Sequence, residues 1–136
     1  MNTRLVGAAW ACALLVSLAA CDPDELVEQR DQGWQRRTMA DMRNMATANA
    51  TMRIDTGRYA RSLAELAENG YMQVVPPTDG WGNAWAYSTG ADTYTITSWG
   101  SDGAPGPAPP VDWVGEPDDP DIILMNGQFT QAPMGR

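Results

Sequence analysis

The chain has 136 residues, 43% of them apolar, and a formal net charge of −8. This length allows one small domain, and the acidic balance argues against nucleic acid as a partner because phosphate binding needs clustered positive charge. Histidine and lysine are absent. Because the usual general bases are therefore missing, we expect neither an enzyme nor an organic cofactor nor a small-molecule substrate.

The N-terminus is typical of a targeting segment. A short region with one positive charge, Arg4, precedes an apolar run of 16 residues from Leu5 to Ala20. A helix that crosses a bilayer needs about 20 such residues, so this run is short for a membrane span. It ends in Leu18-Ala19-Ala20-Cys21, which resembles the lipobox of bacterial lipoproteins.

The lipobox has a physical reason. Small residues before the cut fit a peptidase cleft, and the thiol of Cys21 is the nucleophile that takes up diacylglycerol. We therefore expect residues 1–20 to be removed and Cys21 to be lipidated. The alternatives are an ordinary signal peptide or an uncleaved anchor. Asp22 follows the cysteine directly. In enteric bacteria an aspartate at this position tends to retain a lipoprotein in the inner membrane, but this rule varies with lineage.

Lipidation has two consequences. An acylated Cys21 leaves the mature chain no cysteine for a disulfide, although the compartment beyond the membrane could be oxidising. The domain is then expected to be anchored to a cell membrane and to face the periplasm. Both the inner and the outer membrane are possible sites of the anchor.

A helix is predicted from Asp24 to Ile54. Its apolar residues keep to i, i+3, i+4 and i+7 spacings, and core packing explains this stripe better than a binding groove does: Met39, Met42, Met45, Ala46 and Met52. Asp22 or Asp24 can cap the start, and Gly57 suits the stop. Gly33 weakens the middle by about 1 kcal/mol relative to alanine, so the part before residue 34 is expected to be a separate turn or a frayed stalk.

A second, shorter helix begins at the capping box Ser62-Leu63-Ala64-Glu65. Ser62 is expected to accept from the Glu65 amide, and the Glu65 carboxylate to accept from the Ser62 amide. Asn69-Gly70 ends the helix, whose inward face consists of Leu63, Leu66 and Ala67. From Tyr71 to Pro77 the chain is expected to be extended, because proline excludes helix.

Two strands are predicted next, from Trp81 to Tyr87 and from Tyr94 to Trp99. Bulky residues recur at every second position in both, which is the period of a strand with one buried face. The residues between them, Ser88 to Asp92, include the glycine and short polar residues that a hairpin needs. The pair is therefore antiparallel, and the upstream helix supplies the cover for its aromatic face.

Four motifs between Asp55 and Gly103 carry a family resemblance. They are Asp55-Thr56-Gly57-Arg58-Tyr59, then Ser62 to Leu66 with Gly70-Tyr71, then Pro76 to Asn83 with Tyr87, and finally Tyr94 to Gly103. In this order and at these distances they resemble the globular half of the major pseudopilin of type II secretion systems. The resemblance implies an α+β fold in which a long N-terminal helix packs on a small antiparallel β-sheet, with a short second helix. To this fold the sequence adds a long Pro/Asp-rich loop, which is longer than the family's usual one.

The sequence also departs from the family's pattern. Ala60, Gly80 and Ala84 stand where the family usually has proline, and Trp85 stands where it has tyrosine. The family's cleavage site and the long hydrophobic helix that packs its filament core are absent, and a lipid anchor replaces them. The resemblance therefore implies the fold of the globular domain but not that this chain polymerises.

Residues 101–121 form the Pro/Asp-rich loop, here called the acidic loop. Its carboxylates repel one another unless they spread in solvent or share a cation. In the family that it resembles the corresponding loop binds calcium, which implies side-chain ligands among Asp102, Asp118, Asp119 and Asp121, completed by backbone carbonyls. Calcium takes oxygen ligands from irregular loops. The alternative is a solvated loop that holds no metal.

The C-terminal segment from Ile122 to Thr130 is predicted to extend the sheet begun at Trp81. Its Asn126-Gly127 pair, flanked by apolar residues, is the strongest short-range hairpin signal. Ile122 and Leu124 are expected to point to one face, and Ile123 and Met125 to the other.

Three segments and two functions follow. We expect a signal peptide at 1–20, an anchor, stalk and helix start at 21–37, and a globular domain at 38–136. The function implied is that of a lipid-anchored, pseudopilin-like structural or interaction protein of the envelope, whose partners are the membrane through Cys21 and pseudopilins or other secretion components. The alternative is a stand-alone, calcium-stabilised envelope binding module unrelated to secretion, with Trp113 as its recognition residue.

Overall fold

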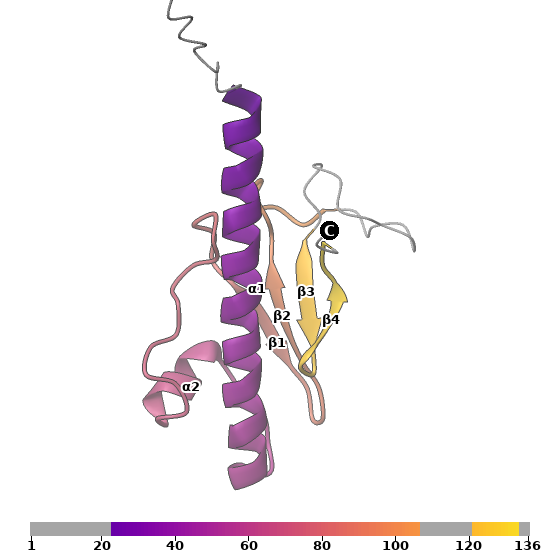
Figure 1. The fold of residues 1–136 in the computed structure, drawn as a ribbon. Helices are drawn as coiled ribbons and strands as arrows, with labels where there is room; N and C mark the ends of the chain where they lie inside the picture. The colour runs from indigo at the N-terminus through magenta and orange to yellow at the C-terminus, as the bar shows by residue number, and fades with distance from the viewer. Residues whose placement is uncertain (1–22, 107–120, 134–136) are drawn as a thin grey trace, which may run out of the picture.

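The structure is a computed structural model that describes residues 23–106 and 121–133. Two helices, α1 (Pro23–Thr56) and α2 (Leu63–Glu68), precede four strands: β1 (Ala86–Thr89), β2 (Tyr94–Ser98), β3 (Ile122–Met125) and β4 (Gln128–Gln131). The strands form one antiparallel sheet in the order β1-β2-β3-β4. Helix α1 runs along one face of this sheet, and α2 lies beside the lower half of α1 (Figure 1). The predicted α+β fold is confirmed.

The core lies between α1 and the sheet. Met42 and Met45 of α1 are fully buried and pack on strand residues, chiefly Tyr94, Ile96 and Leu124. Lower on the helix, Met52 packs on α2 in a second cluster with Ala48, Ala60 and Leu66. The helical spacing of the methionines therefore identified the buried stripe correctly.

Helix α1 is continuous through Gly33, so the expected break before residue 34 is wrong. It begins at Pro23, whose fixed φ and missing N–H suit the first helical position. Asp24 thus lies inside the first turn and is not the cap, and Asp22 lies outside the described residues. The predicted stop is confirmed, because the Gly57 amide donates to the Arg53 carbonyl at 2.8 Å.

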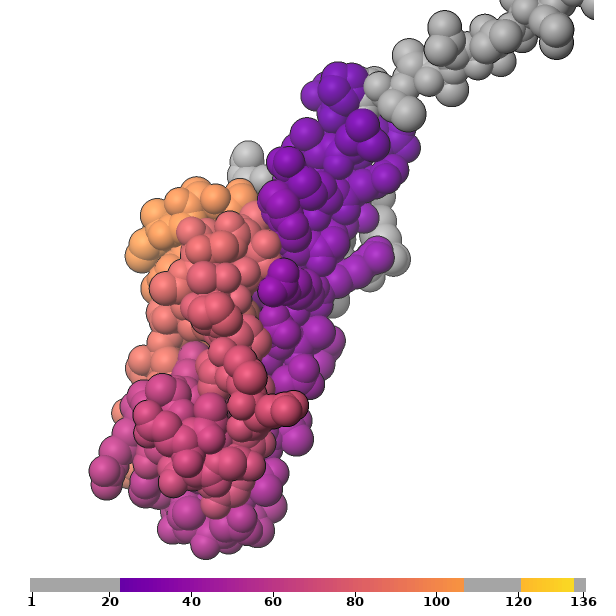
Figure 2. All heavy atoms as spheres, turned by 90° about the vertical axis from the view of Figure 1, so that its left-hand side faces the viewer, coloured from indigo at the N-terminus to yellow at the C-terminus, as the bar shows by residue number. Residues whose placement is uncertain are grey.

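The upper part of α1 stands clear of the sheet. Thr38 is the first fully buried residue of the helix, and Figure 2 shows the segments that pack beside α1 ending below its upper turns. We call residues 23–37 the stalk. Two apolar side chains on it, Leu26 and Val27, are 54% and 48% exposed. Among the residues that the structure describes, helices that could cross a membrane are not found.

The first strand begins later than predicted. Residues 81–85 are not part of the sheet, and β1 starts at Ala86. It pairs with β2 as far as Thr89, which lies opposite Tyr94. The reason is the Asp79 carboxylate, which accepts from the amides of Trp81 and Asn83 and winds them into a turn. Gly82 in this turn has a φ of +91°, which a strand residue does not adopt.

The C-terminal hairpin is confirmed. Asn126 and Gly127 have φ values of +49° and +85°, as the two central residues of a type I′ turn require. Ile122 and Leu124 are buried whereas Met125 is 42% exposed, so the predicted alternation of faces is also correct. This hairpin joins the sheet through β3, which pairs with β2.

The capping box of α2 differs from the prediction in one bond. Ser62 Oγ accepts from the Glu65 amide as expected, but the Glu65 carboxylate accepts from the amide of Arg61, at 2.6 Å, and not from that of Ser62. The Arg58 guanidinium donates to both oxygens of the same carboxylate, at 2.6 and 3.2 Å. The Arg58 guanidinium thus holds the Glu65 carboxylate at the amide of Arg61, one residue before the predicted donor Ser62.

These bonds predict a pH dependence. The hydrogen bonds from Arg58 first, and from the Arg61 amide second, lower the pKa of Glu65 from 4.5 to about 2. Because the folded-state pKa is depressed, the stabilisation is fully present above about pH 4.5 and is lost as the pH falls toward 2. We expect Glu65→Gln to lower the melting temperature at pH 7, with a difference from the parent chain that shrinks between pH 4.5 and 2.

Circular dichroism melts at several pH values check this, with Glu68→Gln, exposed on the same helix, as the matched control. A difference between parent and Glu65→Gln that stays constant with pH would contradict the charge-assisted origin of the contact.

Candidate functional site

The Asp79 side chain organises the end of the sheet at which β2 stops. It is 1% exposed. Its Oδ1 accepts from the amides of Trp81 and Asn83, at 3.0 and 2.8 Å, and its Oδ2 accepts from the hydroxyl of Ser98, at 2.6 Å. Three hydrogen-bond donors therefore converge on one buried carboxyl group. We call residues 79–83 the Asp79 turn.

Asn83 joins the Asp79 turn to the start of the acidic loop. Its Nδ2 donates to the Gly100 carbonyl at 2.6 Å, and the Gly100 amide donates to Ser98 Oγ at 3.3 Å. The Asn83 side chain also touches Gly103, where an added Cβ would lie 2.8 Å from its Oδ1. The motif residues before β1 and after β2 therefore form one packed hydrogen-bonded unit.

Gly80 joins the same turn to α1. Its amide donates to Thr38 Oγ1 at 2.9 Å, and that hydroxyl donates to the Trp34 carbonyl at 2.8 Å. A Cβ on Gly80 would overlap the Trp34 carbonyl oxygen and lie 2.8 Å from Thr38 Oγ1. Proline, which the family usually has here, would lack the N–H donor and collide with the helix. Glycine at this position therefore allows the turn to approach α1 closely.

A second departure from the family has the same kind of explanation. Asn49 of α1 is fully buried. Its Oδ1 accepts from the Ala60 amide at 2.9 Å, and its Nδ2 donates to Tyr87 Oη at 2.9 Å. The Tyr87 hydroxyl in turn donates to the Ala60 carbonyl at 2.6 Å. Because the Ala60 amide is used as a donor, a proline here would leave Asn49 Oδ1 without it.

The predicted metal ligands are placed only in part. Asp102 is exposed and its Oδ1 accepts from the Ala104 amide at 2.9 Å, whereas Asp121 is 4% exposed and its Oδ2 accepts from the Gly106 amide at 2.9 Å. Both carboxylates thus border the segment 102–106 and are oxygen donors of the kind that calcium takes. Asp118 and Asp119 lie outside the described residues, as does Trp113.

Within residues 23–106 and 121–133, groups of three or more metal-ligating side chains are not found. A calcium site of the predicted composition would therefore need carboxylates from the part of the acidic loop between Gly106 and Asp121. Cys21, the predicted lipidation site, also lies outside the described residues.

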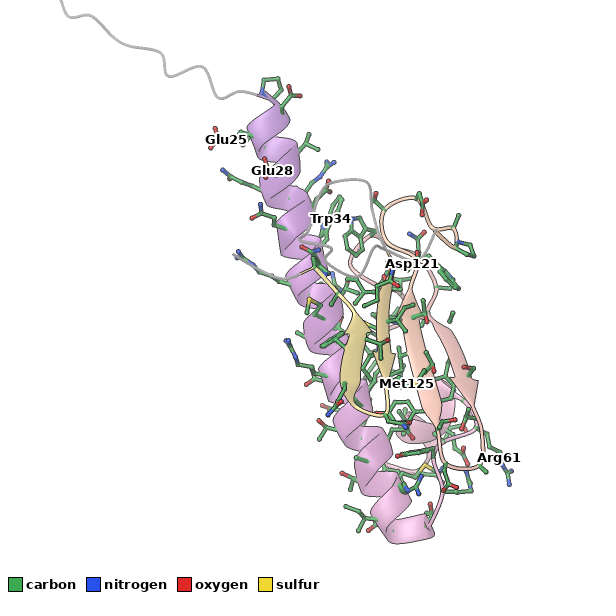
Figure 3. The ribbon with its side chains drawn as sticks, turned by 90° about the vertical axis from the view of Figure 1, so that its right-hand side faces the viewer. Glu25, Glu28, Trp34, Arg61, Asp121 and Met125 are labelled. Atoms are coloured by element: carbon green, nitrogen blue, oxygen red, sulfur yellow. The ribbon has the colours of Figure 1, made fainter. Side chains whose placement is uncertain are left out.

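The stalk adds a polar surface to this end of the molecule. Figure 3 shows Trp34 pointing from α1 toward the end of the sheet where Asp121 lies, whereas Glu25 and Glu28 point away from it. The Arg30 guanidinium lies 4.6 Å from the centre of the Trp34 ring, a cation–π distance. Trp34 thus marks the point where the stalk meets the Asp79 turn.

Two structural residues were missed by the sequence analysis, which considered only apolar residues on α1. Thr38 and Asn49 fall on the same stripe as Met42, Met45 and Met52, because Thr38 lies four residues before Met42 and Asn49 lies four residues after Met45 and three before Met52. A polar residue on a buried helical stripe needs a hydrogen-bond partner. That rule could have singled out both residues, although not their partners.

A long helix packed on a small antiparallel sheet, closed at one end by the Asp79 turn, defines a pseudopilin-like α+β domain. The sequence matches the family described as Type II secretion system (T2SS), protein G, over residues 25–112, which is more than half of the chain. The chain belongs to this family. Its members are structural parts of a secretion machine and not enzymes, which associates this chain with the envelope and with secretion components. Comparison with curated proteins and with solved structures gives no match.

Proposed function

We propose that this family member is a lipid-anchored accessory of the secretion machine that contacts pseudopilins and does not form a filament core itself. The observation that carries the proposal is the composition of the stalk. Its acidic residues, Asp24, Glu25, Glu28 and Asp31, leave Leu26 and Val27 as the only aliphatic side chains in its first three turns. Burying this many charges between packed helices without partners costs far more than the two aliphatic residues return.

The start of α1 supports a separate anchor. If the apolar run from Leu5 continued into α1 as one helix, Pro23 would lie in a helix interior, where its ring collides with the carbonyl four residues before it. Proline suits the first position of a helix instead, where its missing N–H would have no partner within the helix. An anchor that ends before this proline, with a lipid on Cys21, fits such a start.

The stalk is also the proposed contact surface for the partner. At a rise of about 1.5 Å per residue its 15 residues span roughly 22 Å, which separates the globular part from a bilayer at the anchored end. Leu26 and Val27 are adjacent and half exposed, and acidic residues flank them. An apolar patch with a negative rim fits a partner helix that carries apolar and basic side chains.

Lipidation is tested on the full chain in a bacterium that processes lipoproteins. Mass spectrometry of the membrane-extracted protein should find an N-terminal Cys21 that carries diacylglycerol, and Cys21→Ser should abolish both the cleavage and the lipid. Cys12→Ser is the matched control and should be processed as the parent is. A mature protein that keeps Met1 and carries no lipid would contradict the anchor.

The partner is tested by a photocrosslinking amino acid at Leu26 in cells that assemble a type II secretion machine. We expect an adduct whose second component is identified as a pseudopilin. The same amino acid at Ile54, which is 84% exposed at the other end of α1, is the control and should give none. Equal adducts from both positions, or adducts that never contain a secretion component, would contradict the proposed contact.

We further propose that the acidic loop holds calcium, with Asp102 and Asp121 among the ligands and Asp118 and Asp119 supplying the rest. Calcium at a hundredfold excess over its dissociation constant should stabilise the fold by about 2.7 kcal/mol. Asp102→Ala should abolish this gain, whereas Glu68→Ala on α2 should keep it. Equal melting temperatures in calcium and in chelator would contradict the site.

A stand-alone envelope binding module is the second candidate. An open groove of about 450 Å³ between α1 and residues 71–74 favours it. Val74, which lines this groove, is 69% exposed. Deleting the gene separates the two functions, because secretion should fail if the protein is an accessory of the machine and persist if it is an unrelated module.

A further inference from the structure

We infer that the Asp79 turn mechanically couples the start of the acidic loop to the stalk of α1, so that ordering one of them fixes the other. The inference goes beyond the proposed function, since it requires neither a lipid nor a bound ion. It rests on a continuous series of short polar contacts among described residues.

The series begins at the loop. The Gly100 carbonyl accepts from Asn83 Nδ2 at 2.6 Å, and the backbone at Gly103 packs against the same side chain. Asn83 is in turn bound through its amide to Asp79 Oδ1 at 2.8 Å. The position of residues 100–103 is therefore transmitted to the interior of the Asp79 turn through one amide side chain.

The series continues from the turn to the helix. Gly80 follows Asp79 directly, and its amide donates to Thr38 Oγ1 at 2.9 Å. With no Cβ, its backbone lies against the Trp34 carbonyl and the Thr38 hydroxyl. Above Thr38 the helix has no fully buried residue, so this contact is the uppermost tight attachment of the described part of α1 to the rest of the fold.

The turn is too short to open at one end alone. Its five residues are closed by the Asp79 amide, which donates to the Asn83 carbonyl at 2.8 Å, and by the carboxylate, which binds two of its amides. The same carboxylate also accepts from Ser98 of β2. A shift at Asn83 therefore displaces Asp79, and Asp79 positions Gly80 because the two are adjacent in the chain. Coupling of this kind acts equally in both directions.

Hydrogen exchange on the full chain tests the coupling from both ends. Thr38→Val keeps the shape of the side chain and removes the acceptor for the Gly80 amide. If the two ends are coupled, the amides of Gly100, Ala104 and Gly106 should exchange about fivefold faster in this variant, as the loss of one net hydrogen bond predicts. Thr38→Ser, which keeps the hydroxyl, should restore the parental rates.

The reverse arm uses Asn83→Ala, which cuts the bond to Gly100. Amides of residues 34–38 in α1 should then exchange about fivefold faster. Thr47→Val is the matched control, because Thr47 makes the same bond to a carbonyl four residues before it, on the exposed side of α1. It should leave both groups of amides unchanged.

Each arm decides by itself, since coupling is reciprocal. If a variant fails to fold, the other arm supplies the answer. Faster exchange confined to the substituted contact, or the same change at both ends in Thr47→Val, would overturn the inference.

Discussion

Asp79→Ala is expected to lower the free energy of unfolding by about 4 kcal/mol, because it removes the buried acceptor of three donors at once. The amides of Trp81 and Asn83 and the Ser98 hydroxyl would all lose a partner in a site where the carboxylate is 1% exposed. Urea unfolding measured by tryptophan fluorescence checks the value. A loss of this size is a large share of the stability of a small domain.

Asp79→Asn is the matched control for this prediction. The amide oxygen can accept from both backbone amides, and the amide nitrogen can donate to the Ser98 hydroxyl oxygen. We therefore expect a loss of only about 1 kcal/mol, from the weaker bonds of a neutral acceptor. Equal losses from alanine and asparagine would show that the charge, and not the number of acceptors, is what stabilises the turn.

Gly80→Ala is expected to cost about 3 kcal/mol by overpacking. The added methyl group would meet the Trp34 carbonyl, which is helix backbone, and the Thr38 hydroxyl, which is itself hydrogen-bonded to that carbonyl. The turn would have to retreat from α1, which would also stretch the bond from the Gly80 amide to Thr38. Gly80→Pro should be worse still, because it removes that donor altogether.

Gly33→Ala is the control with the opposite sign. A Cβ at this position meets nothing within 4 Å, and alanine is preferred to glycine in a helix interior by about 1 kcal/mol. This variant should therefore raise stability modestly, or raise only the helicity of the stalk. A stabilising Gly80→Ala would contradict the close approach of the turn to α1.

The elements that local pattern specifies were predicted well. The methionine stripe of α1, the stop at Gly57 and the hairpin at Asn126-Gly127 depend on periodicity or on backbone conformations that few residues adopt. In each of these cases the physical cause lies within a few residues of its effect. The family motifs between Asp55 and Gly103 belong to the same class, since they were found in order along the chain.

Errors arose where a side chain just outside the recognised pattern decides the local structure. Alternating aromatic residues predicted a strand from Trp81, but the Asp79 carboxylate winds that segment into a turn first. The capping box predicted the Ser62 amide as donor to Glu65, but Arg58 from the preceding segment draws the carboxylate toward Arg61. The Asp79 contact is a local turn of the kind that aspartate favours, and alternation of aromatic residues alone does not reveal it. The Arg58 contact comes from outside the four residues of the capping box.

Two of the three missing prolines illustrate the same division. Comparison of the motifs shows that Ala60 and Gly80 differ from the family's usual residue, and nothing in the sequence says what compensates. The structure pairs Ala60 with Asn49 and Gly80 with Thr38, each across the gap between a loop and α1. An amide donor that proline would lack is used in both cases.

The sequence by itself determined the kinds of element in this protein, the face that α1 buries and the family to which the chain belongs, because periodicity, turn chemistry and ordered motifs are properties of neighbouring residues. Only the tertiary structure decided that the Asp79 turn joins the acidic loop to the stalk. Asp79, Asn83, Ser98 and Thr38 are spread over 61 residues of chain, from 38 to 98, and hydrogen bonds between such distant groups depend on how helix and sheet pack together.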